Sequence, residues 1–356
     1  MPRLAVLDPT MTGRQAKGLE QHLRHVIVGQ EEAIQDIVTA YQAYVAGLSS
    51  AGRPIANFLF LGPTGSGKTR IVEATAEHLL KDPRAVIKID CAEFQHSHEI
   101  AKLIGSPPGY LGHRETHAAL SQEALNQYHT DEVKLSLVLF DEIEKASDAL
   151  WNLLLGILDK GILTLGDNRR VDFSATMIFM TSNLGAAEMN SLVKPRLGFD
   201  APKQEDAAPN AKESARICRT GIAAARRKFS PEFINRLDKI VVFKSFGQDE
   251  LRRIVDIELE ALQARVQSAT KGKPFQFHVT ESAKDLLLEE GTNLNYGARP
   301  LKRAIERLIV QPLSNLIATG QIRRGDQLCI TDSGSTCQLS FFREIPGTQA
   351  WDTVAA

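Results

Sequence analysis

The sequence predicts an α/β fold, in which a three-layer sandwich with a five-stranded parallel sheet is followed by a small, mainly helical domain with a β-hairpin. Five short runs are almost continuously apolar, as expected for strands that are buried on both faces of a parallel sheet. Helical patterns lie between these runs. The runs are Asn57–Leu61, Ala85–Ile89, Leu135–Phe140, Thr176–Thr181 and Lys239–Phe243.

Two of the intervening helices are well marked. Lys68–Leu80 begins directly after a glycine-rich turn, and Asp148–Leu158 carries leucines at positions that share one helical face. An alternation of strands and helices is typical of a parallel sheet that is covered by helices on both sides.

The pattern changes after Phe246. Three amphipathic helices are expected there, followed by the two strands of the hairpin: Gln248–Gln267, Thr280–Glu290, Arg299–Ile317, Gln327–Thr331 and Cys337–Phe342. We therefore expect an N-terminal extension (1–25), a large subdomain (26–246), a small subdomain (247–346) and a tail (347–356). The polar stretch Ala201–Lys212 is expected to be a surface loop.

Composition excludes several classes of protein. The 356 residues are 43% hydrophobic and 24% charged, with a formal net charge of -1, so no global basic field marks a nucleic-acid binder. No run approaches the ~18 apolar residues of a membrane span, and the N-terminus lacks the apolar core of a signal peptide. The four cysteines have no metal-ligand spacing. Cys329 and Cys337 could face each other on the hairpin, but free thiols in a reducing cytoplasm are the favoured interpretation.

A phosphate-binding loop follows the first predicted strand. Its residues fit the pattern G-x-x-x-x-G-K-[ST], and the pattern stands between a strand and a helix, as it must: Gly62, Pro63, Thr64, Gly65, Ser66, Gly67, Lys68 and Thr69. The glycines allow backbone N–H groups to point at phosphate oxygens. Lys68 is expected to reach the β- and γ-phosphates of ATP, and the Thr69 hydroxyl to ligate Mg²⁺.

Two adjacent carboxylates end the third predicted strand. Asp141 is expected to hold the Mg²⁺ shell, and Glu142 to polarise the attacking water as a general base. Acidic residues also cap helices, so the pair alone is weak evidence. Its pairing with the upstream phosphate loop makes it strong.

Seven stretches together resemble the ATPase module of the Clp family of AAA+ unfoldases, closest to the second module of members with two rings. In chain order they are Val26–Gln30, Gly47–Thr69, Gly105–Gly112, Val138–Ala146, Thr181–Gly185, Phe229–Leu237 and Tyr296–Leu301. The resemblance extends over residues 17–342, which is almost the whole chain. It implies the AAA+ form of the P-loop sandwich, ATP/ADP and Mg²⁺ as cofactors, and a homo-oligomeric ring, which in this family is a hexamer.

The resemblance also assigns roles around the nucleotide. Asn183 resembles the sensor that orients the lytic water, and Arg299 the second sensor, which reaches the γ-phosphate from the small subdomain. Arg236 resembles the arginine finger that a subunit offers to its neighbour. An intramolecular ion pair remains the alternative for Arg236. Ile27 and Val28 resemble the apolar pair that holds adenine, and core residues are an equally good interpretation of them.

Two loops bear on the substrate and partners. Tyr110 and Leu111, between glycines, resemble the loop that lines the central pore and grips polypeptide. Residues 166–173 stand where the family has a second pore loop, and a solvated turn is an equally good interpretation of them. Leu197, Gly198 and Phe199 resemble the loop that docks a barrel-shaped peptidase, although three residues are a weak motif and an ordinary loop is the favoured interpretation.

Other family features differ here. The polar segment 113–134 is longer than the usual connection, and only about 25 residues precede the module. Substrate choice would then come from the ring itself or from an adaptor.

The favoured hypothesis is thus an ATP-dependent unfoldase or remodelling chaperone that threads polypeptide. Two alternatives stay open: a nucleotide-switched assembly or scaffold factor for one dedicated partner, and a nucleic-acid-linked AAA+ motor. The near-neutral charge and the apolar pore loop count against the motor.

Overall fold

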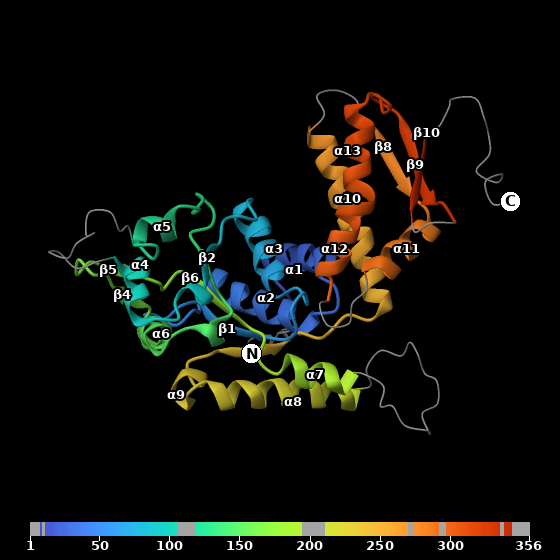
Figure 1. Cartoon of the computed structure of the whole chain (residues 1–356). Helices are drawn as coiled ribbons and strands as arrows, with labels where there is room; N and C mark the ends of the chain where they lie inside the picture. Colours follow the sequence, from blue (N-terminus) through green and yellow to red (C-terminus); the bar gives the residue numbers. More distant parts are fainter. Residues whose placement is uncertain are drawn as a thin grey trace, which may run out of the picture. The chain divides into compact units, whose positions relative to one another are not determined.

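The computed structural model describes Asp8 and residues 11–105, 118–193, 211–269, 274–291, 297–334 and 338–343. The chain divides into two compact units, residues 1–245 and 246–356. Each unit is described by itself below, with the element labels of Figure 1.

The first unit is built around a five-stranded sheet in the order β2-β3-β6-β1-β7, and every neighbouring pair is parallel. The strands are β1 (Ala56–Leu61), β2 (Ile87–Asp90), β3 (Ser136–Asp141), β6 (Thr176–Ser182) and β7 (Lys239–Val242). This confirms the predicted sheet. The central strands β1, β3 and β6 are buried almost throughout, whereas β2 and β7 have exposed positions because they form the edges.

One face of this sheet is rich in aromatic residues. The rings of Phe58, Phe60 and Phe179 lie 5.2–5.9 Å apart from centroid to centroid, and all three side chains are buried. They belong to the same core cluster as apolar residues of α1 (Arg14–Val26), α2 (Glu31–Val45) and α3 (Lys68–Leu80). These three helices therefore form one outer layer of the sandwich.

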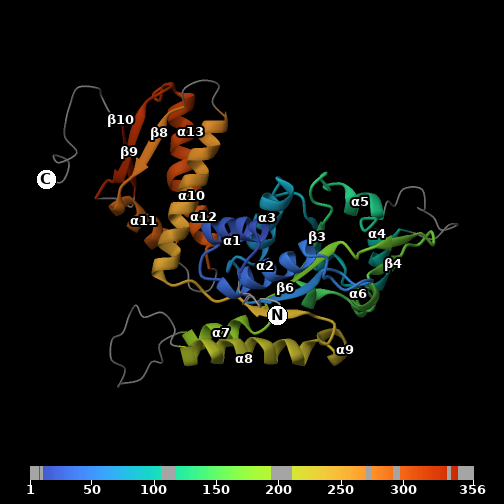
Figure 2. The same ribbon diagram turned by 180° about the vertical axis from the view of Figure 1, so that it is seen from behind.

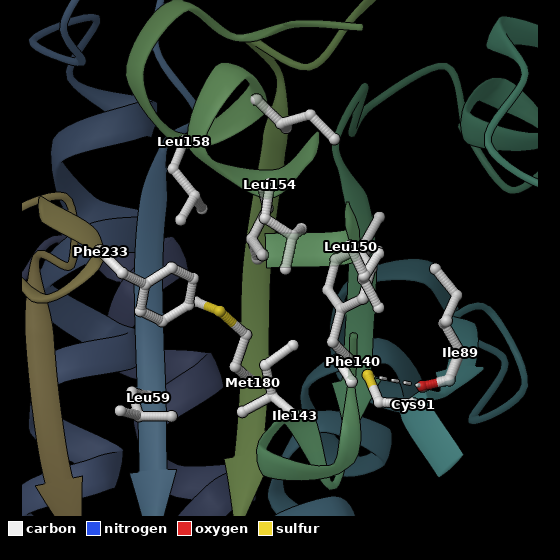
Figure 3. Packing of buried hydrophobic residues seen from close by; sticks show 14 of the residues in the cluster. Leu59, Ile89, Cys91, Phe140, Ile143, Leu150, Leu154, Leu158, Met180 and Phe233 are labelled. Carbon is white, nitrogen blue, oxygen red and sulfur yellow. Dashed lines mark hydrogen bonds between the residues drawn. The ribbon is translucent and has the colours of Figure 1, made fainter. Parts of the chain in front are cut away.

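The alternate residues of the same strands point to the opposite face. Figure 3 shows Leu59, Phe140 and Met180, from three adjacent strands, packed against the leucines of α6 (Asp148–Lys160). Phe233 of the short helix α9 (Pro231–Ile234) joins this cluster. Helices on both faces complete the expected three layers, and α6 agrees with the predicted helix to within two residues at its end.

Helix α1 covers residues 14–26, and all of these except Val26 fall in the stretch 1–25 that was expected to be an N-terminal extension. Leu19 and Leu23 are fully buried in the aromatic-rich core, so this helix is part of the first unit and not a separate arm. The sequence analysis missed it because polar and charged residues fill the exposed face and lower the average hydrophobicity.

The remaining helices, strands and turns complete the description of the first unit. They are α4 (Ala101–Ile104), α5 (Gln122–Asn126), α7 (Ala186–Val193), α8 (Ala211–Lys228), the antiparallel ribbon of β4 (Ile162–Thr164) and β5 (Arg170–Asp172), and the 3-10 turns Cys91–Glu93, Ser97–Ile100 and Ile143–Lys145. Both views show α7 and α8 side by side (Figures 1 and 2).

The ribbon includes part of the segment expected to be a second pore loop. Arg170 lies in β5, while Arg169 pairs with Asp167 at 2.7 Å and with Glu123 of α5 at 3.2 Å. Gln122 Oε1 also accepts a hydrogen bond from Asp172 N at 2.8 Å. The described part of the polar segment 113–134 therefore packs beside this ribbon.

The second unit combines helices with a three-stranded sheet in the order β10-β9-β8. Its elements are α10 (Gln248–Ala269), β8 (Gln276–Val279), α11 (Glu281–Gly291), α12 (Arg299–Ile305), a π-helical turn (Glu306–Val310), α13 (Gln311–Ala318), β9 (Gln327–Asp332) and β10 (Leu339–Arg343). The hairpin β9–β10 is confirmed. β8 was not expected, because its four residues are too short to give a clear alternating pattern.

Among the described residues, Cys91, Cys218 and Cys329 are thiols and not parts of disulfides. Cys337 lies outside the described residues, so the favoured expectation that it and Cys329 form no disulfide stays a prediction for Cys337. Within the described ranges, we find no helix with both the length and the apolar character that a bilayer crossing demands.

A histidine pair makes the packing of α1 on α3 sensitive to pH. The rings of His22 and His78 lie 5.2 Å apart, and burial lowers the pKa of both below 6.5, with Glu77 opposing this effect for His22 and with Arg70, Lys81 and His25 as further charged neighbours. The folded chain therefore favours neutral rings, whereas the unfolded chain takes up protons near its ordinary pKa.

We expect the free energy of unfolding to be at its full value above about pH 6.5 and to fall as the pH drops below that. Urea unfolding at several pH values measures this, and the variant His78→Gln should have a shallower dependence. The exposed His98 provides a matched control, because His98→Gln should leave the slope unchanged. Equal slopes for His78→Gln and the parent chain would contradict this assignment.

Candidate active site

The phosphate loop connects the end of β1 to the start of α3, and close packing explains its glycines. A Cβ atom on Gly62 would lie 2.6 Å from the Phe243 carbonyl oxygen, and Gly62 has a φ of +149°. Gly65 and Gly67 have φ values of +78° and +96°. Glycine adopts such angles without the strain that a side chain would add, so the loop can curl around a group placed above the first turn of α3.

Lys68 is directed into this loop. Its Nζ donates hydrogen bonds to Gly62 O at 2.7 Å, to Pro63 O at 2.9 Å and to Asn183 Oδ1 at 3.0 Å. The side chain is buried, with only 8% exposed. These three acceptors hold the Lys68 ammonium group inside the loop, where it can donate to phosphate oxygens.

The two carboxylates stand where the sequence predicts them, at the end of β3 beside β6. Thr181 of β6 contacts both residues: its hydroxyl donates a short hydrogen bond to the Asp141 carboxylate at Oδ1 and accepts one from the backbone N–H of Glu142 at 3.1 Å. Thr181 is 1% exposed. The sequence analysis gave this threonine no role, although a hydroxyl at the end of the neighbouring strand was the available signal.

Asn183 links the carboxylates to the phosphate loop. Its Nδ2 donates to Glu142 Oε1 at 3.1 Å, while its Oδ1 accepts from Lys68 Nζ and from Thr64 Oγ1 at 3.4 Å. Its backbone N–H is held by Glu144 Oε1 at 3.0 Å. The structure therefore brings four of the predicted residues together around one side-chain amide.

Glu142 adopts an unusual backbone conformation. Its φ of 56° lies in the left-handed region, which is rare for residues other than glycine, asparagine and aspartate and is concentrated at functional sites. Its carboxylate also forms a short ion pair with Lys145, which raises the pKa of Lys145. The turn thus presents the Glu142 carboxylate to Asn183 on one side and to a lysine on the other.

Cys91 lies near these carboxylates but is an unsuitable nucleophile. It is completely buried, and burial, with smaller contributions from Asp141 and Asp90, raises the pKa of its thiol far above the ordinary value. The thiol therefore stays protonated and packs as a small apolar group.

The donor set fits Mg²⁺ bound together with a nucleotide. Thr69 is half-buried beside Lys68, and Asp141 ends the strand opposite, so one hydroxyl and one carboxylate oxygen are available. Across the part of the chain that the structure describes, no group of three or more His, Cys, Asp or Glu residues could hold a metal ion by itself. Mg²⁺ commonly completes its shell with water and substrate phosphate oxygens, which suits so small a set of protein ligands.

Arg236 lies at the end of the sheet where the parallel strands begin, opposite the end that carries the phosphate loop. Its carbonyl accepts a hydrogen bond from Asn57 Nδ2 at 3.2 Å, and Asn57 stands near the start of β1, whereas the phosphate loop follows the end of β1. The five residues from Asn57 to the end of β1 span about 16 Å between these two ends of the sheet. In the single chain, the guanidinium pairs with Glu232 at 3.1 Å and Asp159 at 3.8 Å. The intramolecular ion pair left open above is therefore present.

For the other predicted residues, the structure gives the burial of some, while others lie outside the described ranges. Ile27 and Val28 are both buried, and Ile27 packs into the aromatic-rich core. Arg299 is exposed at the first residue of α12 in the second unit. Tyr110 and Leu111 lie outside the described residues. So do Leu197, Gly198 and Phe199.

Comparison with protein families gives two matches along the chain. Residues 53–240 match the AAA domain (Cdc48 subfamily), and residues 246–330 match the C-terminal, D2-small domain of ClpB protein. The first match alone covers more than half of the chain.

Curated relatives carry Clp names. The chain is 37% identical over 344 residues to the chaperone protein ClpB of Rhodopseudomonas palustris, which covers 96% of this chain and 36% of the relative. It is 38% identical over 316 residues to the ATP-dependent Clp protease ATP-binding subunit ClpC of Staphylococcus saprophyticus, covering 89% and 36%. The chain thus spans about a third of the length of these relatives.

Solved structures of Hsp104 have the same fold. The extended conformation of the S. cerevisiae Hsp104:casein complex matches with a TM-score of 0.76 and 30% identity, over 93% of this chain and 53% of that one. A closed-state reconstruction of Hsp104 with ATPγS and FITC casein matches with a TM-score of 0.74 and 31% identity, over 92% and 52%.

The hydrogen bonds of the Thr181 hydroxyl are expected to stabilise the fold. Thr181→Val keeps the shape but leaves the part-buried Glu142 N–H without its acceptor and removes the donor to Asp141, so we expect a loss of about 1–3 kcal/mol in the free energy of unfolding. Thr75→Val is the matched control, because the Thr75 hydroxyl is equally buried and its hydrogen bond goes only to Ile71 O within α3. Denaturant unfolding of both variants measures the difference, and equal losses would contradict a special role for Thr181.

Proposed function

The chain belongs to the AAA family of ATPases, with a ClpB-type small domain after its AAA domain, and on that premise we propose that it is the motor module of an ATP-dependent protein unfoldase. The observation that carries the proposal is the Asn183 network, which joins Lys68, Thr64 and Glu142 above the end of the parallel sheet. ATP would bind in the phosphate loop, with Ile27 and Val28 beside the adenine.

Each residue of the network has a chemical task in this proposal. Lys68 and the backbone N–H groups of the loop neutralise the β- and γ-phosphates. Glu142 accepts the proton of the attacking water, and Asn183 keeps that carboxylate and the water in line. Mg²⁺, held by Thr69 and Asp141, would neutralise charge on the phosphate oxygens.

Two arginines would act from outside this network. We assign Arg236 to the active site of a neighbouring subunit, because its backbone carbonyl and the Asp159 carboxylate that pairs with its guanidinium lie near the start of β1, remote from its own phosphate loop. A guanidinium added in trans stabilises charge on the transferred phosphoryl group. Arg299, exposed at the start of α12, would sense the γ-phosphate from the second unit.

A ring follows from the trans arginine, since every site then needs a neighbour. The proposed ring is a homo-hexamer that works in the cytoplasm and pulls polypeptide through its pore. The similar Hsp104 structures contain casein, which supports a polypeptide substrate. Tyr110 and Leu111 would grip the substrate.

The proposed partners beyond the ring are an adaptor and a peptidase. An adaptor would select substrates. Docking of a barrel-shaped peptidase through Leu197, Gly198 and Phe199 is supported by the name of the similar ClpC, an ATP-binding subunit of a Clp protease.

A mixing experiment tests the trans arginine. Arg236→Ala alone and Glu142→Gln alone should each lose about 100-fold or more of ATPase activity, because each removes one half of a shared site. In a 1:1 mixture, an Arg236→Ala subunit beside a Glu142→Gln subunit regains a complete site. We therefore expect recovery at about a quarter of the sites, half of a half, by the logic of an arginine supplied in trans. Steady-state phosphate release measures this, and no recovery at any ratio would place Arg236 in its own subunit's site or outside catalysis.

A second experiment tests threading. Tyr110→Ala should keep ATPase activity within about threefold but lose at least tenfold in the rate of unfolding of a tagged fluorescent protein, because the grip depends on a bulky apolar side chain. Tyr110→Phe is the matched control and should unfold the substrate normally. If Tyr110→Ala unfolds as fast as the parent chain, the scaffold alternative replaces threading.

A further inference from the structure

The side chain of Gln30 joins two backbone segments that are far apart in the sequence. Its Nε2 donates to Ser66 O at 3.3 Å and to Lys244 O at 3.1 Å, while its Oε1 accepts from Lys244 N at 3.2 Å. The side chain is buried, with 5% exposed. Both amide hydrogens and the amide oxygen are therefore used, all with backbone groups.

Lys244 needs this partner because the sheet ends there. The register of β1 against β7 ends at Val242, and the following Phe243 N still donates to Leu61 O at 2.7 Å. One residue further, the Gln30 amide takes both polar groups of the Lys244 backbone, as a neighbouring strand would. The second unit begins two residues later, at Phe246.

Ser66 lies at the other end of the connection, inside the phosphate loop. It stands between Gly65 and Gly67, it is 1% exposed, and its hydroxyl donates to Pro63 O at 2.8 Å. A change in the loop that moves the Ser66 carbonyl must therefore move the Gln30 amide or break its hydrogen bond.

Gln30 itself is held in place. It precedes α2, which is tied to β7 by the ion pair of Asp36 with Lys239 at 3.1 Å. Ile34 N also donates to Gln30 O at 3.2 Å. A fixed backbone with a fully used amide leaves little freedom to follow one partner without the other.

We infer that Gln30 is a positioning residue that couples the state of the phosphate loop to the backbone leading into the second unit. The inference rests on the proposed binding of ATP in that loop. When phosphate groups reorganise the carbonyl of Ser66, the Gln30 amide transmits the change to Lys244, so the connection between the units responds to the nucleotide.

Three variants separate this role from simple stability. Gln30→Met keeps the length of the side chain but can form none of the three hydrogen bonds. Gln30→Glu, as a carboxylate, can accept from Lys244 N but can donate to neither carbonyl. Gln35→Met is the matched control, because Gln35 is exposed on α2, the helix that Gln30 precedes, and its amide donates to Glu20.

The experiment is hydrogen exchange of the backbone amides of residues 239–246 in the full chain, with and without Mg·ATPγS, after nucleotide binding has been measured separately. In the parent chain and in Gln35→Met, we expect the exchange rate of the Lys244 amide to change at least about threefold on nucleotide binding. In Gln30→Met, this amide should exchange about tenfold faster and should no longer respond to the nucleotide. Gln30→Glu should keep the protection of the amide but lose the response.

Distinct outcomes overturn distinct claims. A response of parental size in Gln30→Met or Gln30→Glu would overturn the coupling role while leaving the proposed ATPase intact. A parent chain that binds nucleotide without any change at Lys244 would do the same. A parent chain that binds no nucleotide would instead overturn the proposed function, and the coupling with it.

Discussion

The parallel direction of five strands is the constraint on which the rest of the first unit depends. Because β1, β3 and β6 run the same way, their carboxyl ends meet at one edge, and the phosphate loop, the two carboxylates and Asn183 all follow those ends. Hydrogen bonds then join residues of this site that lie far apart in the chain, such as Thr64 and Asn183, which are 119 positions apart. No local sequence pattern creates this proximity; the sheet order does.

That constraint also explains which features could be predicted from the sequence. The core strands are buried on both faces, so their composition is nearly independent of their neighbours and the apolar runs are easy to recognise. The phosphate loop has a fixed pattern of glycines, because its backbone must adopt left-handed angles at Gly65 and Gly67. The same glycine pattern marks the start of α3, and both ends of this helix, Lys68 and Leu80, were predicted.

What could not be predicted depends on tertiary contacts. Helix α1 hides two buried leucines among charged residues, and β8 gains its place only by pairing with β9, about 50 residues further along the chain. Thr181 and Gln30 look ordinary in the sequence, since a threonine in a strand and a glutamine before a helix are common. Their importance comes from the hydrogen bonds that they make to buried groups across the fold. Sequence patterns report the local backbone, whereas these contacts report the packing of distant elements.

The position of Arg236 has a consequence for symmetry. If Arg236 acts on a neighbouring subunit as proposed, each subunit offers its arginine near the start of β1 and its phosphate loop after the end of β1, about 16 Å further along the strand. An isologous pair would have to bring both edges of each subunit into a single shared patch. A heterologous, head-to-tail contact instead uses a different edge on each side and repeats without change from one subunit to the next. Such a contact closes only when the rotation between neighbours divides a full turn, so the angle between successive subunits decides between a closed cycle and an open helical filament.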